Sequence, residues 1–317
     1  MTVMVMSSVC ALHISLVHPV MAVPASMQEQ SIALPNADFK PRNVDFLPVQ
    51  CYIMGIKLNT ERNKMDYYNI EAFDATGLVK TVFTSKGHGC WLSNSEEGHR
   101  GYREVLSHLG LTEKDIVSTF QRHTDIVRPV THADAGMNTF WRSDPVEPAD
   151  GIITNERGLL LTSMESDCTP VYLLDPVNKA VGMVHSGWKG TASLIAVKAV
   201  EKMRQEYGTD PENVMAAFGP CICRRCYEVG GELMEPFRVN YSQSDITRLF
   251  LPKPGGKYTL DVNLAIRLSL ERCGVRPDRI YDCGLCTYHD GRFYSHRRQL
   301  HDGGPGADHM LTAIMLV

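Results

Sequence analysis

The chain has 317 residues, of which 44% are hydrophobic and 21% charged, as in packed globular proteins. Its formal net charge is −4 and no long basic block occurs, so nucleic acid is not expected as the main partner, because phosphate binding needs a clustered positive face. The ten cysteines are scattered, which favours reduced thiols in a cytoplasmic protein over a disulfide framework.

The first 25 residues are apolar and end in Ala22-Val23-Pro24-Ala25, as a secretory signal does. However, no Lys or Arg precedes the apolar run, and His13 and His18 interrupt it. The run is also too broken for a spanning helix, so no membrane association is expected. We therefore predict a disordered extension over 1–42, a single domain over 43–317 and a cytoplasmic location. Secretion is the alternative if residues 1–25 act as a signal.

Alternating polar and apolar residues predict strands at 51–56 and 78–84. Lys86 follows the second of these in a loop bounded by glycine. Apolar residues at helical spacing predict a helix over 98–109, and Gly110 is expected to stop it. Further strands are predicted at 116–120, 126–130 and 151–154, with a loop over 131–148. An apolar run at 158–162 then leads toward Cys168.

A hairpin is predicted at the centre of the chain. Apolar runs at 171–174 and 180–184 flank the turn residues 175–179. The strands of a hairpin run in opposite directions, so the start of one lies beside the end of the other. Cys168 precedes the first strand and His185 ends the second, and both are therefore expected at one edge of a sheet. A helix is predicted to follow, from about Thr191 to Tyr207.

The remaining elements alternate without a strict βαβ rhythm. Residues 293–298 are predicted as a strand with a basic end that carries Arg297 and Arg298. This pattern favours an α/β, or α+β-like, fold of mixed sheets with outer helices over a doubly wound parallel sheet. The other predictions in this part of the chain are strands at 214–218, 258–261, 280–283 and 310–317, and a helix over 262–273.

His123, Cys168 and His185 are candidate metal ligands, since each begins or ends a predicted strand. A cysteine with two histidines suits zinc, and three protein ligands leave a fourth position for water or substrate. The long sequence spacing favours a site that the fold assembles. Spacing alone also leaves open the interpretation that each is an ordinary core or rim residue.

A second group of thiols lies at Cys221, Cys223 and Cys226. Such a cluster can bind a metal or form a redox pair. Gly219 and Pro220 shape a turn there, however, and the sequence shows no second cluster that would complete a ligand set. We therefore expect these thiols to be reduced and to bind no second metal.

Charged residues supply further candidates. Lys86, Arg297 and Arg298 are candidate phosphate binders, because ammonium and guanidinium groups complement phosphate oxygens. Asp150 and Asp167 are candidate acid–base groups, with a role in caps and turns as the alternative. The chain has no Walker loop, dinucleotide-binding glycine pattern or Gly-x-Ser-x-Gly sequence.

Taken together and in order, the motifs resemble the YfiH-type, laccase-domain family, also labelled polyphenol oxidase. The resemblance runs from about Phe83 to the C terminus, and its most specific block is His185-Ser186-Gly187-Trp188-Lys189-Gly190. The other motifs that carry it are Gln121-Arg122-His123, Asp167-Cys168-Thr169-Pro170-Val171, Gly219-Pro220-Cys221-Ile222 and Phe293-Tyr294-Ser295-His296-Arg297-Arg298.

The resemblance implies a layered sandwich of mixed β-sheets in which 43–317 is the catalytic domain. It implies a zinc-dependent purine nucleoside enzyme that phosphorolyses adenosine, inosine and methylthioadenosine and deaminates adenosine. The implied partners are purine nucleosides and phosphate, with Lys86 and Arg297 as candidate contacts. The family's metal ligands fall on His123, Cys168 and His185, with copper as the alternative ion. Catalysis is assigned to metal-bound water, and no residue is assigned to it.

Three other functions are kept as hypotheses. A copper-dependent phenol oxidase would need close His-x-His pairs, which this chain lacks. A thiol hydrolase would use Cys168 as nucleophile and His185 as base. A non-catalytic partner protein of cell division or envelope assembly would bind metal without turning over any nucleoside. The metal content and the turnover of nucleosides separate these hypotheses.

Overall fold

The computed structural model describes residues 56–58, 67–86, 96–137, 139, 147–304 and 308–317, all of which belong to the unit Cys51–Val317. The predicted extension over 1–42 and most of the predicted strand at 51–56 lie outside the described residues. No helix among the described residues is both long and apolar enough to cross a membrane.

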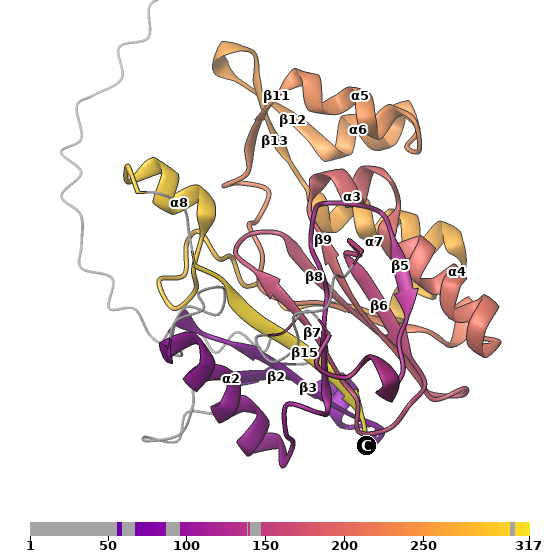
Figure 1. Cartoon of the computed structure of the whole chain (residues 1–317). Coiled ribbons are helices and arrows are strands. Elements are labelled where there is room, and N and C mark those ends of the chain that lie inside the picture. The colour runs from indigo at the N-terminus through magenta and orange to yellow at the C-terminus, as the bar shows by residue number, and fades with distance from the viewer. Residues whose placement is uncertain (1–55, 59–66, 87–95, 138, 140–146, 305–307) are drawn as a thin grey trace, which may run out of the picture. The chain divides into compact units, whose positions relative to one another are not determined.

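Two six-stranded mixed sheets form the centre of the fold (Figure 1). The first has the strand order β1-β2-β3-β15-β7-β4, and its β4–β7 pair is parallel while β15 pairs antiparallel to β3 and β7. Its strands are β1 (Ile56–Leu58), β2 (Tyr67–Ile70), β3 (Val79–Thr84), β15 (Met310–Leu316), β7 (Leu160–Glu165) and β4 (Ile116–Ser118).

The second sheet has the order β14-β10-β8-β9-β6-β5. Its two outer pairs, β10–β14 and β5–β6, are parallel, and the inner pairs are antiparallel. Its strands are β14 (Ile280–Asp282), β10 (Met215–Phe218), β8 (Thr169–Asp175), β9 (Ala180–Ser186), β6 (Gly151–Thr154) and β5 (Val127–Pro129). The prediction of mixed sheets is confirmed.

The alternation of side chains along β8 shows how the layers pack. Tyr172 and Leu174 share a buried cluster with Leu161 and Ile314 of the first sheet. The opposite face of the second sheet packs against α4 (Ile195–Tyr207) and α7 (Val262–Cys273). Both faces of β8 and β9 are therefore buried, which explains their continuous apolar runs.

The first sheet has its own outer helix, α2 (Glu96–Leu109). Val105 and Leu106 of this helix pack in one buried cluster with Val82 and Leu160 of the sheet. The helix ends where Gly110 adopts φ +73°, so the predicted helix stop is confirmed. The order helix, sheet, sheet, helix is the predicted layered α/β sandwich with outer helices.

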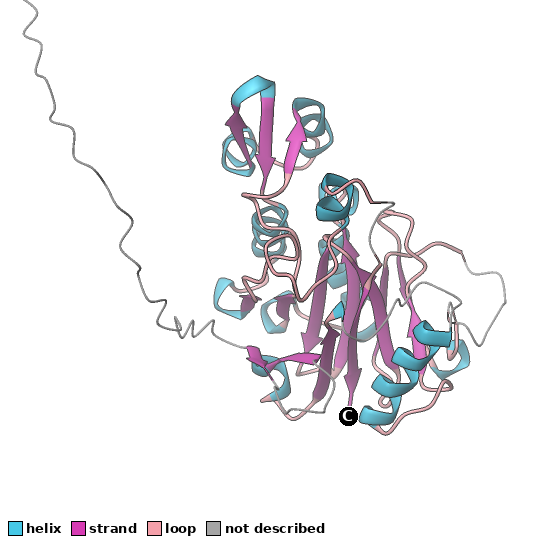
Figure 2. Ribbon diagram, turned by 90° about the vertical axis from the view of Figure 1, so that its left-hand side faces the viewer, coloured by secondary structure: helices cyan, strands magenta, loops and turns pink. Residues whose placement is uncertain are grey.

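A small three-stranded sheet projects from one end of the sandwich (Figure 2). Its order is β11 (Glu228–Gly230), β13 (Lys257–Leu260) and β12 (Phe250–Lys253), with α5 (Met234–Arg238) and α6 (Gln243–Leu249) nearby in sequence. Only β13 was expected from the sequence. The other two strands are short, and β12 contains Pro252, which weakens a strand pattern.

Two predicted elements differ from the structure. The helix expected from Thr191 to Tyr207 is broken into α3 (Trp188–Ala192) and α4, because Leu194 adopts the left-handed φ of 63°. The strand expected at 293–298 is wrong, since α8 (His296–His301) begins there. The Ser295 side chain accepts a hydrogen bond from the Arg298 amide and caps this helix, which places Arg297 in its first turn.

Candidate metal centre and the adjoining pocket

The β8–β9 hairpin places two of the predicted ligands at one sheet edge. Thr169 pairs with Ser186 and Pro170 with His185, so Cys168 directly precedes the paired residues and lies beside the end of β9. The neighbouring strand β6 starts at the same edge, where Gly151 pairs with Val184. The hairpin argument made from the sequence is thus confirmed.

Asp150, just before β6, organises the loop that carries His123. The backbone amides of Arg122, His123 and Thr124 donate to its carboxylate at 3.1, 3.0 and 2.7 Å. His123 adopts φ 57°, which a non-glycine residue adopts only when its surroundings hold it there. Burial by itself would raise the pKa of Asp150, but these hydrogen bonds and that of His185 outweigh it and hold the pKa well below its usual range.

His123, Cys168 and His185 converge on one point. Each offers one ligand atom, and these three atoms lie within 4.8 Å of one another. His123 Nε2 is 3.8 Å from Cys168 Sγ. His185 Nδ1 lies 2.8 Å from Asp150 Oδ1, which leaves Nε2 as the ring atom available for a metal. The donor set of one sulfur and two nitrogens, with a carboxylate behind one imidazole, fits a metal ion of the zinc type.

A buried carboxylate that the sequence analysis missed faces the same point. Glu165 ends β7 and is 1% exposed. Ser163 donates to its Oε1 at 2.7 Å, while Oε2 lies 3.8 Å from His185 Nε2 and has no hydrogen-bond partner in the described part of the chain. Burial raises the pKa of Glu165 to about 7. Only the pairing of β7 with β15 and its packing on the second sheet reveal this position, so no sequence signal could have found it.

Gly187 marks how closely the main chain approaches the ligands. A Cβ atom at this position would lie 2.8 Å from His123 Cδ2 and 2.9 Å from Cys168 Sγ. The φ of Gly187 is −71°, a value open to any residue, so glycine is required here by close packing rather than by backbone conformation. The glycine of the His-Ser-Gly-Trp motif therefore leaves room for the ligand side chains.

A pocket of about 320 Å³ adjoins this group. Trp188, which lines it, follows Gly187 directly. Arg297 also lines it, and its backbone amide donates at 2.7 Å to Asp167, the residue before Cys168. The complete lining is Trp188, Tyr227, Glu228, Val229, Gly230, Glu232, Leu233, Lys257 and Arg297. The pocket therefore combines two aromatic rings, two cations and two carboxylates. Its lining includes none of the three ligand side chains, and it is linked to them through Trp188 and Arg297.

The predicted cations lie in different surroundings. The Arg297 guanidinium donates to the Glu228 carbonyl oxygen at 2.6 Å and lies 5.2 Å from the centre of the Tyr227 ring. Lys86 is exposed and is not among the residues that line the pocket, although its backbone amide donates to the Arg292 carbonyl oxygen at 2.9 Å. The structure therefore places Arg297, and not Lys86, at the pocket.

Arg298 and Asp167 hold loops together. Arg298 Nη1 donates to the carbonyl oxygens of Thr287 and Tyr288 at 2.7 and 2.8 Å, so this guanidinium anchors the loop before α8 and is not part of the pocket lining. Asp167 accepts from Thr287 Oγ1 at 2.5 Å and from the Arg297 amide, and burial raises its pKa. These contacts favour the structural alternative for Asp167.

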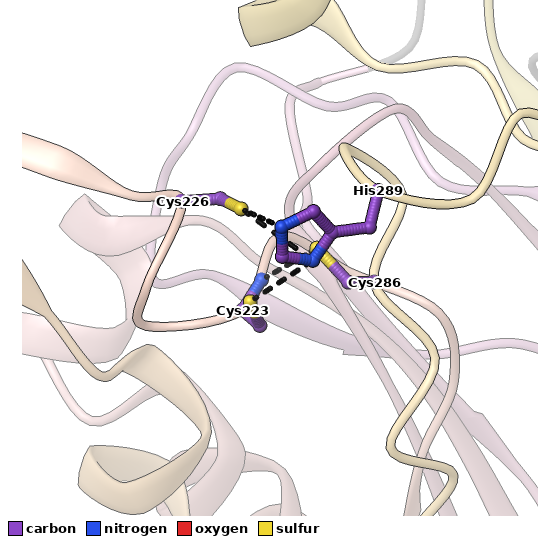
Figure 3. Close-up of side chains that lie close together, drawn as sticks. All are labelled: Cys223, Cys226, Cys286 and His289. Atoms are coloured by element: carbon purple, nitrogen blue, oxygen red, sulfur yellow. Dashed lines mark hydrogen bonds between the residues drawn. The ribbon is translucent and has the colours of Figure 1, made fainter. Parts of the chain in front are cut away.

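The thiol cluster differs from its prediction. Cys223 and Cys226 meet Cys286 and His289, and the four ligand atoms lie within 4.8 Å of one another (Figure 3). The expectation that no further ligand group faces these thiols is therefore wrong. Cys221 is not a member of this group, because it is buried with its Sγ 3.3 Å from Asn263 Oδ1.

Comparison with known proteins identifies relatives of the chain. The chain is 31% identical over 224 residues to purine nucleoside phosphorylase YlmD of Bacillus subtilis (strain 168), covering 70% of this chain and 80% of that protein. It is 30% identical over 195 residues to adenosine deaminase RL5 from an unknown prokaryotic organism, covering 60% of this chain and 72% of that protein.

Among solved structures, the hypothetical protein YfiH of Bacillus licheniformis superimposes with a TM-score of 0.71 and 28% identity, covering 79% of this chain and 96% of that chain. Residues 77–316 match the family model described as multi-copper polyphenol oxidoreductase laccase. The resemblance drawn from the motifs is thereby confirmed, and the chain belongs to this laccase-domain family.

Proposed function

We propose that this protein is a zinc-dependent purine nucleoside enzyme, which cleaves adenosine, inosine and methylthioadenosine with phosphate and deaminates adenosine. The observation that carries the proposal is the convergence of His123, Cys168 and His185 on one point, together with the pocket lined by Trp188 and Arg297. Relatives named as purine nucleoside phosphorylase and adenosine deaminase support the choice of substrate class.

His123, Cys168 and His185 would hold the zinc ion. With three protein ligands, a zinc ion keeps a fourth position at which it can activate water or polarise a substrate atom. Asp150 keeps the His185 ring oriented through the 2.8 Å contact with Nδ1 and holds the His123 loop through three amides. In its ionised form Glu165, 3.8 Å from His185 Nε2, would favour a cation at this point.

The pocket offers complementary groups for the two proposed substrates. Trp188 and Tyr227 present aromatic rings, on which a purine base can stack. Lys257 and Arg297 supply positive charge for phosphate, and a guanidinium has five N–H donors, so its bond to the Glu228 carbonyl oxygen leaves donors for an anion. We assign Arg297 to phosphate and keep as a second candidate the exposed Lys86, which follows β3 and does not line the pocket.

The test measures metal and product in the same preparation of the full chain. The purified protein is analysed for zinc and copper and then incubated with adenosine, with and without phosphate. Adenine reports phosphorolysis and inosine reports deamination, so the two products are quantified separately. We expect zinc, phosphate-dependent adenine and phosphate-independent inosine.

Removal of the metal with a chelator, followed by reloading with zinc or with copper, separates the alternatives. Activity that returns with zinc supports the proposal. Full activity of the metal-free protein would support a thiol hydrolase based on Cys168. Oxidation of phenols by the copper-loaded protein would support a copper-dependent phenol oxidase. A metal-bound protein that turns over none of the nucleosides would contradict the proposed function. Cys273→Ser, which changes a half-buried thiol on α7, is the control for nonspecific effects of losing a cysteine.

A further inference from the structure

We propose that Cys223, Cys226, Cys286 and His289 bind a second zinc ion in a closed structural site. This inference goes beyond the proposed function, because it concerns residues that form no part of the His123, Cys168 and His185 group. Figure 3 shows the three sulfur atoms arranged around the His289 ring. The proposal replaces the prediction that the cysteine cluster binds no metal.

The distances fit tetrahedral coordination. With Zn–S bonds of about 2.3 Å and Zn–N bonds of about 2.0–2.1 Å, neighbouring ligand atoms of a tetrahedral site lie roughly 3.5–3.8 Å apart. Cys226 Sγ is 3.1 Å from His289 Nε2 and 3.7 Å from Nδ1. Cys223 Sγ is 4.0 Å from His289 Nδ1. With Nδ1 as the ligand atom, the distances of 3.7 and 4.0 Å are close to the separation that one shared ion requires, and all four ligand atoms lie within 4.8 Å of one another.

The main chain holds the ligands in place before any metal binds. The Cys223 amide donates to Cys286 Sγ at 3.3 Å. The Cys226 amide donates to the Cys223 carbonyl oxygen at 2.9 Å, which closes a turn between the two cysteines. This turn brings the two thiols of the Cys-x2-Cys sequence to the same side.

Backbone pairing joins the two halves of the site. Cys221 forms a parallel bridge with Cys286, in which the Cys221 amide donates to the Leu285 carbonyl oxygen at 3.2 Å and the Thr287 amide to the Cys221 carbonyl oxygen at 3.0 Å. Cys223 and Cys226 therefore lie beside Cys286 and His289, although the two pairs are far apart in sequence. Each pair has a spacing of two residues between ligands, which is typical of structural zinc sites.

The number and type of ligands identify the ion and its role. Three thiolates and one imidazole are a common ligand set of structural zinc, and four protein ligands leave no position for a substrate. Cys286 is buried and Cys223 and Cys226 are half-buried, whereas His289 is exposed and provides a route of entry for the ion.

The ion would connect two loops that contact residues of the pocket. Tyr227 follows Cys226 directly and lines the pocket. On the other side, Arg298 of α8 binds the carbonyl oxygens of Thr287 and Tyr288, between Cys286 and His289. Loss of the ion is therefore expected to loosen the contact between the Tyr227 loop and α8, where Arg297 lies over the Tyr227 ring.

Metal analysis of the full chain, purified under reducing conditions, tests the proposal. We expect two zinc ions per chain in the wild type and in the Cys273→Ser control. Cys286→Ser and His289→Ala should each hold one zinc, Cys168→Ser should also hold one, and the double variant Cys168→Ser/Cys286→Ser should hold none. A wild-type protein with a single zinc that both Cys286→Ser and His289→Ala retain would overturn the proposal.

Cobalt spectroscopy keeps the test decisive if the serine variants fold poorly. In Cys168→Ser the first group has lost its only thiolate, so among the described residues the second group is the remaining candidate source of sulfur-to-cobalt charge-transfer bands. We expect these bands in Cys168→Ser and their weakening in Cys168→Ser/His289→Ala, whose second substitution is at an exposed side chain. A folded Cys168→Ser protein without such bands contradicts the proposal, as does a wild type in which Cys223, Cys226 and Cys286 are alkylated without release of zinc.

Discussion

The two groups of metal-ligand side chains differ in the residues that contact their histidine ligands. Asp150 and Glu165, both fully or almost fully buried, lie against the imidazole of His185. In the second group the contacts of His289 are the sulfur atoms of Cys223 and Cys226 and the ring of Tyr288. A three-ligand group with carboxylate partners and an adjoining pocket suits chemistry on a substrate, whereas a four-ligand group between two loops suits a cross-link.

The positions of the two groups in the fold agree with these different roles. The first group lies at the edge of a sheet whose strands are buried on both faces. His185 belongs to β9, Cys168 directly precedes β8, and the loop of His123 is held by Asp150. The second group lies on two loops that backbone hydrogen bonds join at Cys221 and Cys286. An ion bound there adds stability that the loops themselves lack, because a metal that binds only the folded form stabilises it.

The largest expected effect comes from removing a ligand of the first group. Cys168→Ser should lose one zinc and nearly all activity together, because a neutral hydroxyl is a much poorer zinc ligand than a thiolate. The loss of activity should be at least about 100-fold, since even the loss of an outer partner costs about 10–100-fold. His123→Ala and His185→Ala should behave alike. If Cys168→Ser lost activity with its full complement of metal and an unchanged fold, Cys168 would be a nucleophile instead.

The carboxylate behind His185 provides the next test. Asp150→Asn should weaken zinc binding at the first group by about 10–100-fold, because the amide loses the charge that supports His185 and the amides of the His123 loop. A competition titration with a chromophoric chelator measures this affinity. The second group should keep its zinc in the same protein. An equal loss at both groups would mean that the change disturbs the whole fold.

Arg297→Ala should distinguish the two proposed reactions. Loss of a charged hydrogen bond costs about 1.5–3 kcal/mol, so the KM for phosphate should rise roughly tenfold or more while deamination is largely spared. Arg279→Ala is a matched control, because its guanidinium also donates to a backbone carbonyl, that of Asn213 at 2.8 Å, and it does not line the pocket. Equal loss of both reactions would assign Arg297 to the nucleoside or to the fold.

A single methyl group tests how closely the first group is packed. In Gly187→Ala the added Cβ would lie 2.8 Å from the His123 ring and 2.9 Å from Cys168 Sγ. Overpacking of this kind costs about 1–3 kcal/mol, and here it should appear mainly as weaker zinc binding at the first group. Gly291→Ala, where a Cβ would meet nothing within 4 Å, is the matched control. Wild-type zinc affinity in Gly187→Ala would show that the ligands can move apart freely.

The sequence predicts the first group much better than the second. The hairpin pattern around 175–179 sets the β8–β9 pairing, and a hairpin is a local structure, so the neighbourhood of Cys168 and His185 follows from it. The second group depends on the parallel bridge between Cys221 and Cys286, a contact between distant segments that no local pattern encodes. Glu165 was missed for the same reason, because its neighbours come from another sheet.

At two further places a local interaction overrides the structure that the sequence pattern predicts. Residues 293–298 have the composition of a strand, but the Ser295 cap begins α8 within them. The apolar periodicity from Thr191 to Tyr207 continues through Leu194, whose left-handed backbone divides the segment into two helices. A side-chain cap decides the structure in the first case and a left-handed backbone in the second, and periodicity reports neither.

The smallest effect is expected from the start of the chain. Residues from Met1 to about Phe39 show no helical or strand period, and the family match begins only at residue 77. All seven proposed ligands lie between His123 and His289. A chain that lacks the first 39 residues should therefore keep its melting temperature within about 1–2 °C and bind both zinc ions, since substitutions away from packed features change stability by less than about 0.5 kcal/mol. Calorimetry and metal analysis of the shortened chain check this. A large fall in melting temperature would show that the extension packs on the domain, and a loss of one zinc alone would show which of the two groups depends on it.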